Sequence, residues 1–371
     1  MLATLHVDFG LDWRGGQSQA LLLMKGLQTR GHVAELLTVN SAPLAHRASR
    51  AGIAVHTVGR QTIRMQGARC LRRLLAEGRF HILHLHDAHA LTAAWLAGAH
   101  CRVRTVASRR LAYRLQRNRF ALARYRSVHR ILAVSQFVAE SVVTSGVPAD
   151  RVEVVYDGIE FPPMPTESEC RSARQMWKVD DRSALLGCVG YLLPEKGQEA
   201  LIRMLPEVLA QFPDCRLMLA GEGPCRGRLV RLTRQLGVES AVHFAGFVED
   251  VAHVYQALDA FLFPSLAEPL GSSLLMAMAY GLPVVAVGRG AVPEVVEDGR
   301  TGLLVAESEP AGIAKAVVQL LRNNQLAAQL GASARESIAQ RFTADHMVDH
   351  TLDAYSRVGP PMNRIWKPAD D

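Results

Sequence analysis

The chain has 371 residues, of which 49% are hydrophobic and 21% are charged. These fractions are typical of a globular protein and exclude a disordered, collagen-like or disulfide-scaffold chain. At about 150 residues per domain, the length predicts roughly two domains. The six cysteines show no metal-ligand spacing, and most lie in apolar or helical stretches, so we interpret them as small buried or incidental residues in a reducing compartment.

Charge is divided unevenly along the chain. Residues 1–157 carry 22 Lys and Arg against 9 Asp and Glu, a net charge of +13, whereas the remaining residues have a net charge of −6. The densest part runs from Arg102 to Arg130, with ten arginines and no acidic residue. This asymmetry predicts an anionic partner for the first half. We expect an anionic membrane surface or a phosphorylated substrate, and no nucleic acid, because no recognised nucleic-acid module accompanies the charge.

We expect neither a signal peptide nor a membrane-spanning helix. Residues 2–7 are strand-like, without the basic region and cleavage site of a signal peptide. The longest uncharged run, residues 269–288, has the length of a membrane span, but its glycines and prolines divide it into turn, helix, turn and strand. We therefore expect a cytoplasmic protein, peripheral to the inner face of the plasma membrane.

Short apolar runs alternate with amphipathic helical runs, which predicts an α/β fold whose parallel sheets are covered on both faces. Seven strands are expected in the first half: Leu2–Val7, Val33–Thr38, Ile53–Thr57, His81–His86, Val103–Ala107, Arg130–Val134 and Val152–Tyr156. Six are expected in the second half: Ala184–Val189, Arg216–Ala220, Val242–Phe244, Ala260–Phe263, Pro283–Val287 and Gly302–Val305. Two such series predict two doubly wound, Rossmann-like domains.

The junction between the two series is marked by prolines. Phe161-Pro162-Pro163-Met164-Pro165 cannot continue a strand or a helix, so we place the boundary near residues 162–180. A helix is expected over about 167–177. Two helical runs, about 310–340 and 343–357, close the chain without a strand after them.

Ligands of doubly wound sheets bind outside the carboxyl ends of the strands, and several motifs lie there. The segment Trp13-Arg14-Gly15-Gly16-Gln17 follows the first strand and precedes a helix of about 17–30. It could bind an anion through backbone N–H groups or form only a tight turn. The segment His84-Leu85-His86-Asp87 ends the fourth strand and puts both histidines on one face. We interpret His84 as a core histidine and His86 as a site residue.

Two motifs lie at strand ends in the second half. In Gly190-Tyr191-Leu192-Leu193-Pro194-Glu195-Lys196-Gly197, a lysine at the start of a helix could hold a pyrophosphate, although alone it would be interpreted as a solvated lysine. Residues 264–286 are the most specific motif, with a carboxylate loop, a glycine, a helix and Gly-x-Pro between two strands. The free N–H groups of Gly271-Ser272-Ser273 begin that helix, and Glu268 precedes them. The Lys196 motif is not a Walker loop, and the glycines before the first helix, Gly10, Gly15 and Gly16, do not form a dinucleotide fingerprint.

Taken together, and in their order along the chain, these motifs resemble those of family-4 retaining glycosyltransferases of the GT-B fold. The similarity covers nearly the whole chain in order. It also rests on Arg30-Gly31-His32-Val33, Val134-Ser135, Tyr156-Asp157-Gly158-Ile159-Glu160, Gly221-Glu222-Gly223-Pro224, Phe244-Ala245-Gly246-Phe247, Asp259-Ala260, Ala277-Met278-Ala279, Glu294 and Gly302-Leu303-Leu304-Val305.

The resemblance implies a reaction and a domain organisation. The C-terminal domain would hold a nucleotide-diphosphate sugar, and the sugar would pass, with retention, to an acceptor hydroxyl held by the N-terminal domain. It implies no metal or other cofactor, because basic side chains and helix N-termini neutralise the leaving diphosphate. Since the last helix of the family crosses back, we expect domains of residues 1–162 plus about 343–371, and 163–342. The expected donor is a UDP-sugar, with a GDP- or ADP-sugar as alternatives, and the expected acceptor is a glycan or a lipid-linked glycan.

The resemblance also implies residue roles. Lys196 should contact the diphosphate, Glu268 should hold sugar hydroxyls without acting as a nucleophile, and His86 should lie beside the sugar or the acceptor; these three are the candidate catalytic residues. The candidate donor-binding residues are Gly15, Gly16, Gly190, Tyr191, Lys196, Gly246, Phe247, Glu268, Leu270, Gly271, Ser272, Ser273 and Met276. The candidate acceptor-binding or membrane-facing residues are Arg109, Arg110, Arg114 and Arg117.

Three donor-site positions depart from the family pattern. Met276 stands where a second glutamate usually grips the ribose, and Tyr191 stands where an arginine usually contacts the diphosphate. Pro269 replaces a glycine and removes a backbone donor. Each lost contact typically costs about 1–3 kcal/mol, unless residues elsewhere, such as Arg14, Arg289 or Glu294, compensate.

We therefore predict a retaining, metal-independent glycosyltransferase of cell-envelope glycan synthesis, acting on lipopolysaccharide, capsule or lipid-linked oligosaccharide. The alternative is a catalytically degenerate homologue that acts as a glycan-binding or scaffold protein. A nucleotide-sugar 2-epimerase is disfavoured by the helix motif, and a nicotinamide dehydrogenase by the lack of a dinucleotide fingerprint.

Overall fold

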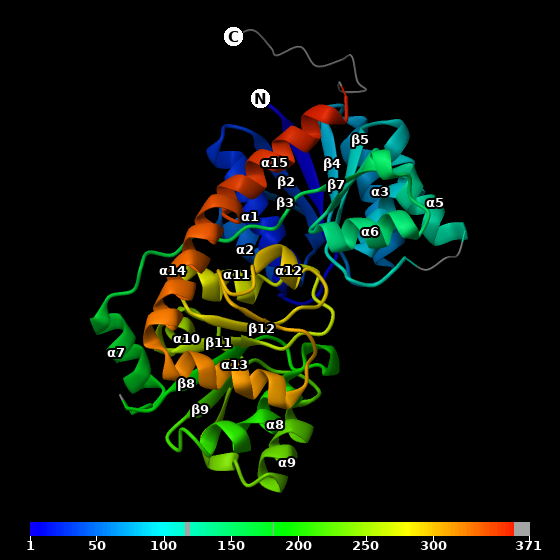
Figure 1. The fold of residues 1–371 in the computed structure, drawn as a ribbon. Coiled ribbons are helices and arrows are strands. Elements are labelled where there is room, and N and C mark those ends of the chain that lie inside the picture. Colours follow the sequence, from blue (N-terminus) through cyan, green and yellow to red (C-terminus); the bar gives the residue numbers. More distant parts are fainter. Residues whose placement is uncertain (116–118, 181, 360–371) are drawn as a thin grey trace. The chain divides into compact units, whose positions relative to one another are not determined.

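The structure is a computed structural model that describes residues 1–115, 119–180 and 182–359, so Arg117 lies outside the described residues. The chain divides into two compact units, residues 1–158 with 344–371 (unit 1) and residues 159–343 (unit 2). Each unit contains one parallel sheet with helices around it (Figure 1). Among the described residues, none of the helices combines the length and the apolar character needed to cross a membrane.

Unit 1 has a seven-stranded sheet of order β3-β2-β1-β4-β5-β6-β7. Its strands are β1 (Ala3–Val7), β2 (Val33–Val39), β3 (Ala54–Val58), β4 (Ile82–Leu85), β5 (Arg104–Arg109), β6 (Arg130–Ala133) and β7 (Val152–Val154). Its helices are α1 (Gly15–Thr29), α2 (Pro43–Arg50), α3 (Ile63–Ala76), α4 (Ala88–Ala97), α5 (Arg119–Ser127), α6 (Gln136–Thr144) and α15 (Ala344–Arg357). All seven expected strands are present at nearly the expected bounds.

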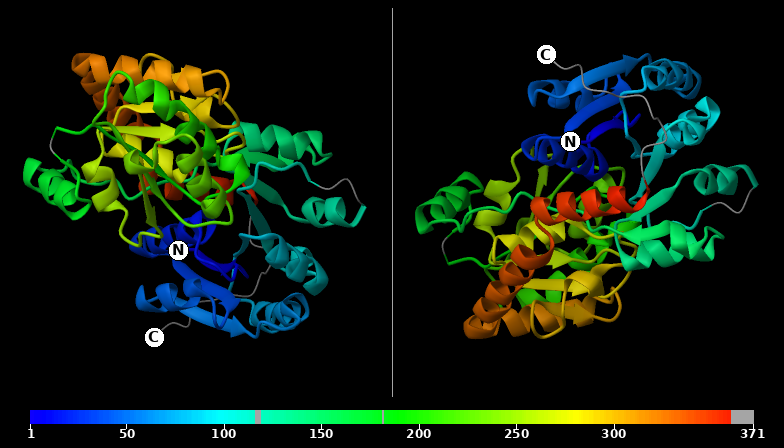
Figure 2. Two further views of the ribbon diagram at one scale, coloured as in Figure 1. Left: turned by 90° about the horizontal axis from the view of Figure 1, so that it is seen from below. Right: turned by 90° about the horizontal axis from the view of Figure 1, so that it is seen from above.

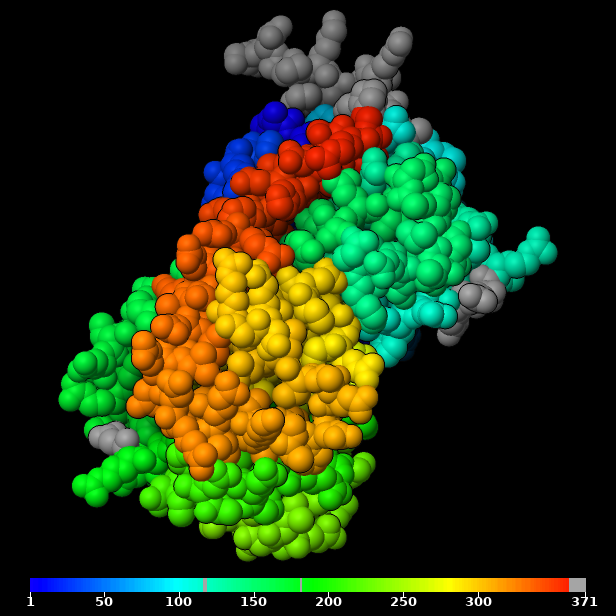
Figure 3. All heavy atoms as spheres, viewed as in Figure 1, coloured from blue at the N-terminus to red at the C-terminus, as the bar shows by residue number. Residues whose placement is uncertain are grey.

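The last helix, α15, packs on the first residues of the chain. Figure 2 and Figure 3 show α15, in red, lying along the blue N-terminal part of unit 1. Met347, Val348 and Tyr355 of α15 join the core that α1 and α2 form with the sheet. Gly26 of α1 allows this approach, because a Cβ there would lie 2.4 Å from Cγ2 of Val348. Apolar burial therefore holds the C-terminal helix on unit 1.

Unit 2 has a six-stranded sheet of order β10-β9-β8-β11-β12-β13. Its strands are β8 (Leu185–Val189), β9 (Arg216–Ala220), β10 (Val242–Gly246), β11 (Ala260–Phe263), β12 (Val284–Val287) and β13 (Leu303–Val305). Its helices are α7 (Glu167–Met176), α8 (Gln198–Leu209), α9 (Arg226–Gln235), α10 (Ala252–Ala257), α11 (Ser272–Ala279), α12 (Val292–Val295), α13 (Pro310–Arg322) and α14 (Asn324–Arg341). All six expected strands are present here too.

The expected helical run of about 310–340 is wrong as a single helix, because it breaks at Asn323. This residue has φ −127° and ψ 82°, and its side chain accepts a hydrogen bond from the N–H of Leu326. Asparagine at the N-cap satisfies one of the unpaired donors at the start of α14. Apolar periodicity continues across the break, which is why the pattern alone did not separate α13 from α14.

The helix α14 supports α11, which begins with the Gly271-Ser272-Ser273 motif. Gly331 of α14 lies against the turn after α11, and a Cβ at Gly331 would lie 2.1 Å from the carbonyl oxygen of Gly281. Arg335 donates hydrogen bonds to the carbonyl oxygens of Ala279 and Pro162. The end of α11 and the proline segment are thus both fixed to α14.

We expect Gly331→Ala to destabilise unit 2, because the backbone of Gly281 cannot yield as a flexible side chain would. Overpacking of this kind typically costs about 1–3 kcal/mol. Gly312→Ala is the matched control, since Gly312 lies in α13 with nothing within 4 Å of a Cβ. That change should stabilise the protein by roughly 0.5–1 kcal/mol through helix propensity. Urea unfolding of both variants checks this, and equal shifts in the two would contradict the packing argument.

Candidate functional site

The candidate catalytic residues of unit 2 lie where the order of its strands reverses. The chain runs from β8 outward to β9 and β10, then returns to place β11 on the other side of β8, so the switch point lies between β8 and β11. Lys196 follows β8 and Glu268 follows β11, and Lys196 Nζ lies 2.6 Å from Glu268 Oε2. The Glu268 side chain is 8% exposed and that of Lys196 is 28% exposed. A nearly buried carboxylate paired with a partly exposed lysine thus occupies the position where doubly wound sheets bind ligands.

Backbone contacts fix the loops that carry this pair. Gly197 has φ +70°, and a Cβ there would lie 2.2 Å from the carbonyl oxygen of Pro264. Gly290 has φ +62°, and its Cβ would lie 2.5 Å from the carbonyl oxygen of Glu268, which also accepts the N–H of Ala291 at 3.0 Å. Only glycine permits both the positive φ and the close approach. The loops after β8, β11 and β12 are therefore tied together around Glu268.

The start of α11 lies next to Glu268 in the chain. Gly271 is its N-cap with φ +102°, Ser272 is exposed, and the carbonyl oxygen of Ser273 accepts the Tyr255 hydroxyl at 3.2 Å. The first N–H groups of a helix lack partners within the helix and favour an anion. Met276, one turn further along, is partly buried. Its side chain carries no oxygen or nitrogen atom.

The other candidate donor-binding residues of unit 2 differ in exposure. Tyr191 is 46% exposed and Phe247 is 67% exposed, each just beyond the carboxyl end of its strand, whereas Leu270 is buried at 3%. Gly190 and Gly246 are backbone positions: Gly190 donates to the carbonyl oxygen of Ala220, and the carbonyl oxygen of Gly246 accepts the N–H of Gly221. Two exposed aromatic side chains therefore lie at this edge of the sheet.

In unit 1 the switch point lies between β1 and β4. Gly15 and Gly16 form the first turn of α1, and a Cβ at Gly16 would meet nothing within 4 Å. Asp8, just after β1, accepts the N–H of Gly10 at 2.8 Å and the Gln17 amide at 3.1 Å, which fixes the loop before α1. Burial and the nearby carboxylate of Asp87 raise the pKa of Asp8 to about 6.

Three buried histidines cluster at the same edge. His6 Nδ1 lies 3.0 Å from His86 Nε2, and the rings of His84 and His86 stack with centroids 4.3 Å apart. His84 contacts the hydroxyls of Tyr355 at 2.6 Å and Ser108 at 2.7 Å. Burial lowers the pKa of His6 to about 3 and holds the pKa values of His84 and His86 well below their usual range. All three rings are therefore neutral at ordinary pH.

One ring nitrogen from each of His6, His84 and His86 lies within 4.8 Å of the other two, so their spacing alone would suit a metal ion. Their hydrogen bonds do not, because Arg110 Nη1 lies 3.2 Å from His86 Nδ1 and can only donate. A metal-bound histidine normally donates its second N–H to an acceptor. We assign no metal to this cluster.

The three candidate arginines among the described residues lie in different surroundings. Arg109 is buried, and its guanidinium contacts the Tyr125 hydroxyl at 3.1 Å and the Tyr113 carbonyl oxygen at 2.6 Å. Arg110 Nε contacts both carboxylate oxygens of Asp157, at 2.8 and 3.1 Å. Arg114 is exposed. Arg109 thus supports the loop after β5, Arg110 belongs to the polar edge of the sheet, and Arg114 faces solvent.

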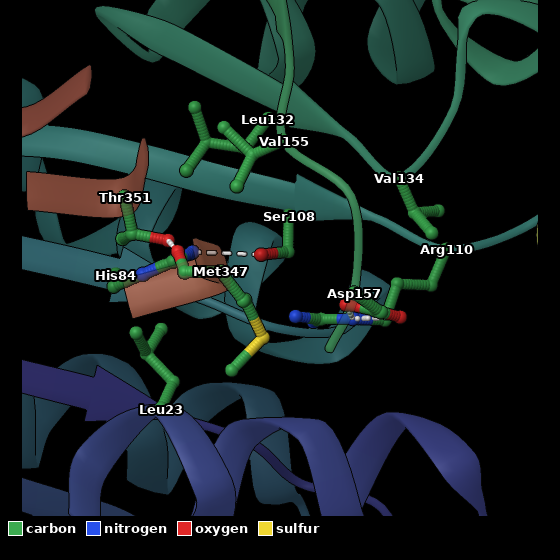
Figure 4. A pocket seen from close by; sticks show the side chains of 10 residues that line it. All are labelled: Leu23, His84, Ser108, Arg110, Leu132, Val134, Val155, Asp157, Met347 and Thr351. Carbon is green, nitrogen blue, oxygen red and sulfur yellow. Dashed lines mark hydrogen bonds and ion pairs between the residues drawn. The ribbon is translucent and has the colours of Figure 1, made fainter. Parts of the chain in front are cut away.

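A small cavity lies beside Arg110 and has room for about one water molecule. Figure 4 shows Arg110 and Asp157 side by side on one side of it, with His84 and Ser108 joined by a hydrogen bond on the other. Burial raises the pKa of Asp157, and the adjacent Arg110 opposes that shift.

Sequence reasoning missed His6 and Asp8 and gave Asp157 no role. A signal was present, since Asp8 follows β1 directly and Asp157 lies just beyond β7, at the edge where ligands bind. His6 lies in β1 itself, and its pairing with β4 sets it opposite His84. The pairing of β1 with β4 depends on strand order, which the sequence did not reveal.

Comparison with known proteins assigns the family. Residues 13–161 match Glycosyltransferase Family 4, and residues 183–323 match Glycosyl transferases group 1. The two matches fall in the two halves of the chain and together cover more than half of it. The chain belongs to glycosyltransferase family 4.

Individual relatives match a smaller part of the chain than the two family matches together. An uncharacterised glycosyltransferase of Methanocaldococcus jannaschii is 31% identical over 63% of this chain and 62% of that protein. A GDP-mannose-dependent alpha-(1-6)-phosphatidylinositol monomannoside mannosyltransferase of Mycolicibacterium smegmatis is 32% identical over 54% of this chain and 55% of that protein. The chain therefore spans less than two thirds of the length of either relative.

A solved structure shows the same fold over nearly the whole chain. The crystal structure of Anabaena HepE in complex with UDP and glucose has a TM-score of 0.83 and 22% identity, and covers 96% of this chain and 100% of that one. The GT-B fold that the sequence predicted is thereby confirmed.

We expect Asp8→Asn to stabilise the protein above about pH 6 and to change little near pH 4. Because the folded-state pKa of Asp8 is raised from 3.8 to about 6, the folded protein holds a proton there that the unfolded chain releases. The contribution of Asp8 to stability therefore falls as pH rises from about 4 to about 6. Asn removes this loss, worth roughly 1–3 kcal/mol.

Urea unfolding at pH 4.5 and pH 7.5 (about the two limits set by the Asp8 pKa) measures the difference. Asp12→Asn is the control, since the Asp12 side chain is 67% exposed. An Asp8→Asn effect of the same size at both pH values would contradict the raised pKa.

Proposed function

We propose that this family-4 glycosyltransferase is a retaining enzyme that transfers a sugar from a nucleotide-diphosphate sugar to an acceptor hydroxyl in cell-envelope glycan synthesis. The observation that carries the proposal is the Lys196–Glu268 pair at the switch point of unit 2, beside the start of α11. UDP bound to HepE and the GDP-mannose dependence of the mycobacterial relative support a nucleotide-sugar donor. We favour a UDP-sugar and keep a GDP- or ADP-sugar as alternatives.

The pair suggests how the donor is bound. Lys196 neutralises Glu268 at 2.6 Å, so a donor must offer both groups new partners. A diphosphate would take the ammonium and the first N–H groups of α11, while sugar hydroxyls would donate to the carboxylate. As the bond to the anomeric carbon breaks, negative charge grows on the diphosphate, where Lys196 and the α11 amides stabilise it. The proposed chemistry needs no metal to balance this charge.

Two features of the edge bear on the donor pocket. Met276 and the exposed Tyr191 replace a ribose-binding carboxylate and a diphosphate-binding guanidinium of the family. A working site must then rely more heavily on Lys196. If the protein no longer binds a donor, it is a degenerate glycan-binding or scaffold homologue. Met276 and Tyr191 would then explain the loss of donor binding.

Nucleotide binding separates these possibilities. We expect isothermal titration calorimetry, in the presence of a chelator, to detect one nucleotide among UDP, GDP, ADP and their sugar conjugates. Lys196→Ala should weaken that binding about 10- to 100-fold, because a charge-assisted contact contributes about 1.5–3 kcal/mol. Lys315→Ala, an exposed lysine of α13, is the matched control and should leave the affinity unchanged. No binding of any nucleotide at millimolar concentration would favour the degenerate homologue.

We also propose that unit 1 binds an anionic membrane surface where a lipid-linked acceptor resides. Leu111, Tyr113 and Phe120 are 48%, 61% and 74% exposed, and Arg114 and Arg119 beside them are exposed. Aromatic side chains partition into the headgroup region, and each arginine near an anionic surface adds about 1 kcal/mol. The lipid acceptor of the mycobacterial relative, a phosphatidylinositol monomannoside, supports an acceptor of this class.

Sedimentation with vesicles tests the membrane proposal. Wild type should bind vesicles containing phosphatidylglycerol and not pure phosphatidylcholine vesicles, and binding should weaken with salt. The double variant Arg114→Ser and Arg119→Ser, which removes two exposed charges, should reduce binding at least about fivefold. Arg231→Ser and Arg234→Ser on α9 of unit 2 remove two exposed charges as the matched control. Equal losses in the two double variants would show that total charge alone matters.

A further inference from the structure

A chain of hydrogen bonds runs through the buried edge of unit 1 and joins residues in or just beyond five strands, β1, β2, β4, β5 and β7. Arg110 Nε contacts Asp157 at 2.8 Å, and Arg110 Nη1 lies 3.2 Å from His86 Nδ1. His86 Nε2 lies 3.0 Å from His6 Nδ1, and His6 Nε2 lies 3.0 Å from Thr4 Oγ1. Thr4 Oγ1 lies 3.0 Å from the carbonyl oxygen of Val33. Every link is within hydrogen-bond distance.

Both ends of this chain impose the same direction. A guanidinium only donates, so Nδ1 of His86 must accept and its proton must reside on Nε2. That proton is donated to His6 Nδ1, which leaves the His6 proton on Nε2 and directed at Thr4. At the other end, a backbone carbonyl only accepts, so the Thr4 hydroxyl donates its single proton to Val33 and must accept from His6. The hydrogen-bond direction that follows from Arg110 is therefore the same as the direction that follows independently from the Val33 carbonyl oxygen.

We propose that Arg110, anchored by Asp157, is a positioning residue that holds His86 and His6 as neutral Nε2–H tautomers in one directed chain. Protonation of either ring would set two donors against each other, at Arg110 for His86 or at His86 for His6. His84 provides the contrast, since it lies between the hydroxyls of Tyr355 and Ser108. Either hydroxyl can donate or accept, so nothing fixes the direction at His84.

The chain of hydrogen bonds determines which groups at this edge of the sheet can contact a ligand. Both nitrogens of His86 are engaged, so His86 has no nitrogen left to take a proton from an acceptor hydroxyl. Arg110 keeps Nη2 without a hydrogen-bond partner among the described residues, and its side chain is 15% exposed. The acceptor would then meet a fixed guanidinium here, not a titrating imidazole. This consequence for catalysis rests on the proposed glycosyltransferase function, whereas the tautomers do not.

Burial and the neighbouring His84, His6 and Arg110 all favour the neutral form of His86. His6 faces it from β1, His84 from β4, Arg110 from beyond β5, and the charge of Arg110 is balanced by Asp157 beyond β7. From α15, Tyr355 reaches only His84, and its hydroxyl stays protonated because burial raises its pKa.

Long-range proton–nitrogen NMR of histidine-labelled protein tests the proposal directly. Asn substitutions of His6 and His86 assign the two signals. We expect both rings to show a protonated Nε2 and an unprotonated Nδ1, without titration across a pH range of about 5.5–8.5. Arg110→Lys should keep this pattern, because lysine is also a pure donor. Arg110→Leu combined with Asp157→Asn, which leaves no unpaired carboxylate, should free Nδ1 of His86 to take a second proton, so that the ring titrates in that range. Nε2 of His86 should stay protonated in this variant, because the Thr4 end still fixes the direction.

Two control variants separate the effect of Arg110 on the tautomers from the loss of the Asp157 carboxylate and from the loss of a nearby positive charge. Asp157→Asn alone and Arg114→Leu should leave the tautomers unchanged, and near-ultraviolet circular dichroism verifies the fold of each variant. A wild-type His86 that titrates, carries its proton on Nδ1, or is unaffected in the double variant would overturn the proposal. Where transfer is measurable, the wild-type pH profile should lack a histidine-dependent limb that the double variant gains. Failure to detect any transfer would count against the proposed function and leave the NMR test intact.

Discussion

The arrangement of both candidate sites depends on one constraint, namely that a parallel sheet covered on both faces can present side chains to a ligand only at its edges. The faces of both sheets are filled by apolar residues from the surrounding helices. All strands of a sheet end on the same side, so the polar residues that follow them collect there. Lys196 and Glu268, 72 residues apart, meet for this reason, and so do Arg110 and Asp157, 47 residues apart.

Much of this could be predicted from the sequence, because the determining patterns are local. Alternation of strands and helices predicts both sheets. Lys196 and Glu268 became candidates because their motifs, taken together with the others along the chain, resemble those of family-4 glycosyltransferases. Asn323 illustrates the limit of local patterns, since a single capping residue breaks an apolar period that otherwise continues.

The parts that could not be predicted depend on which strands are neighbours. His6 meets His86 only because β4 lies next to β1 in the sheet, although three helices and two strands separate them in the chain. Arg110 was one of ten similar arginines in a basic stretch, and charge alone could not distinguish it from Arg114. Its position after β5, within reach of Asp157 beyond β7, gives it a different role from an exposed neighbour.

At both sheet edges a carboxylate is paired with a basic side chain, but the base is a lysine in unit 2 and an arginine in unit 1. Each edge holds a carboxylate that burial would otherwise penalise, and each pairs it with one basic side chain. Lysine is a compact charge on a flexible stem, so Lys196 can leave Glu268 when a diphosphate offers a better partner. Arginine is a planar group, and Arg110 uses separate N–H groups on Asp157 and His86. A cation held at two points is suited to fixing protons in its surroundings, whereas one held at a single point is suited to following a substrate.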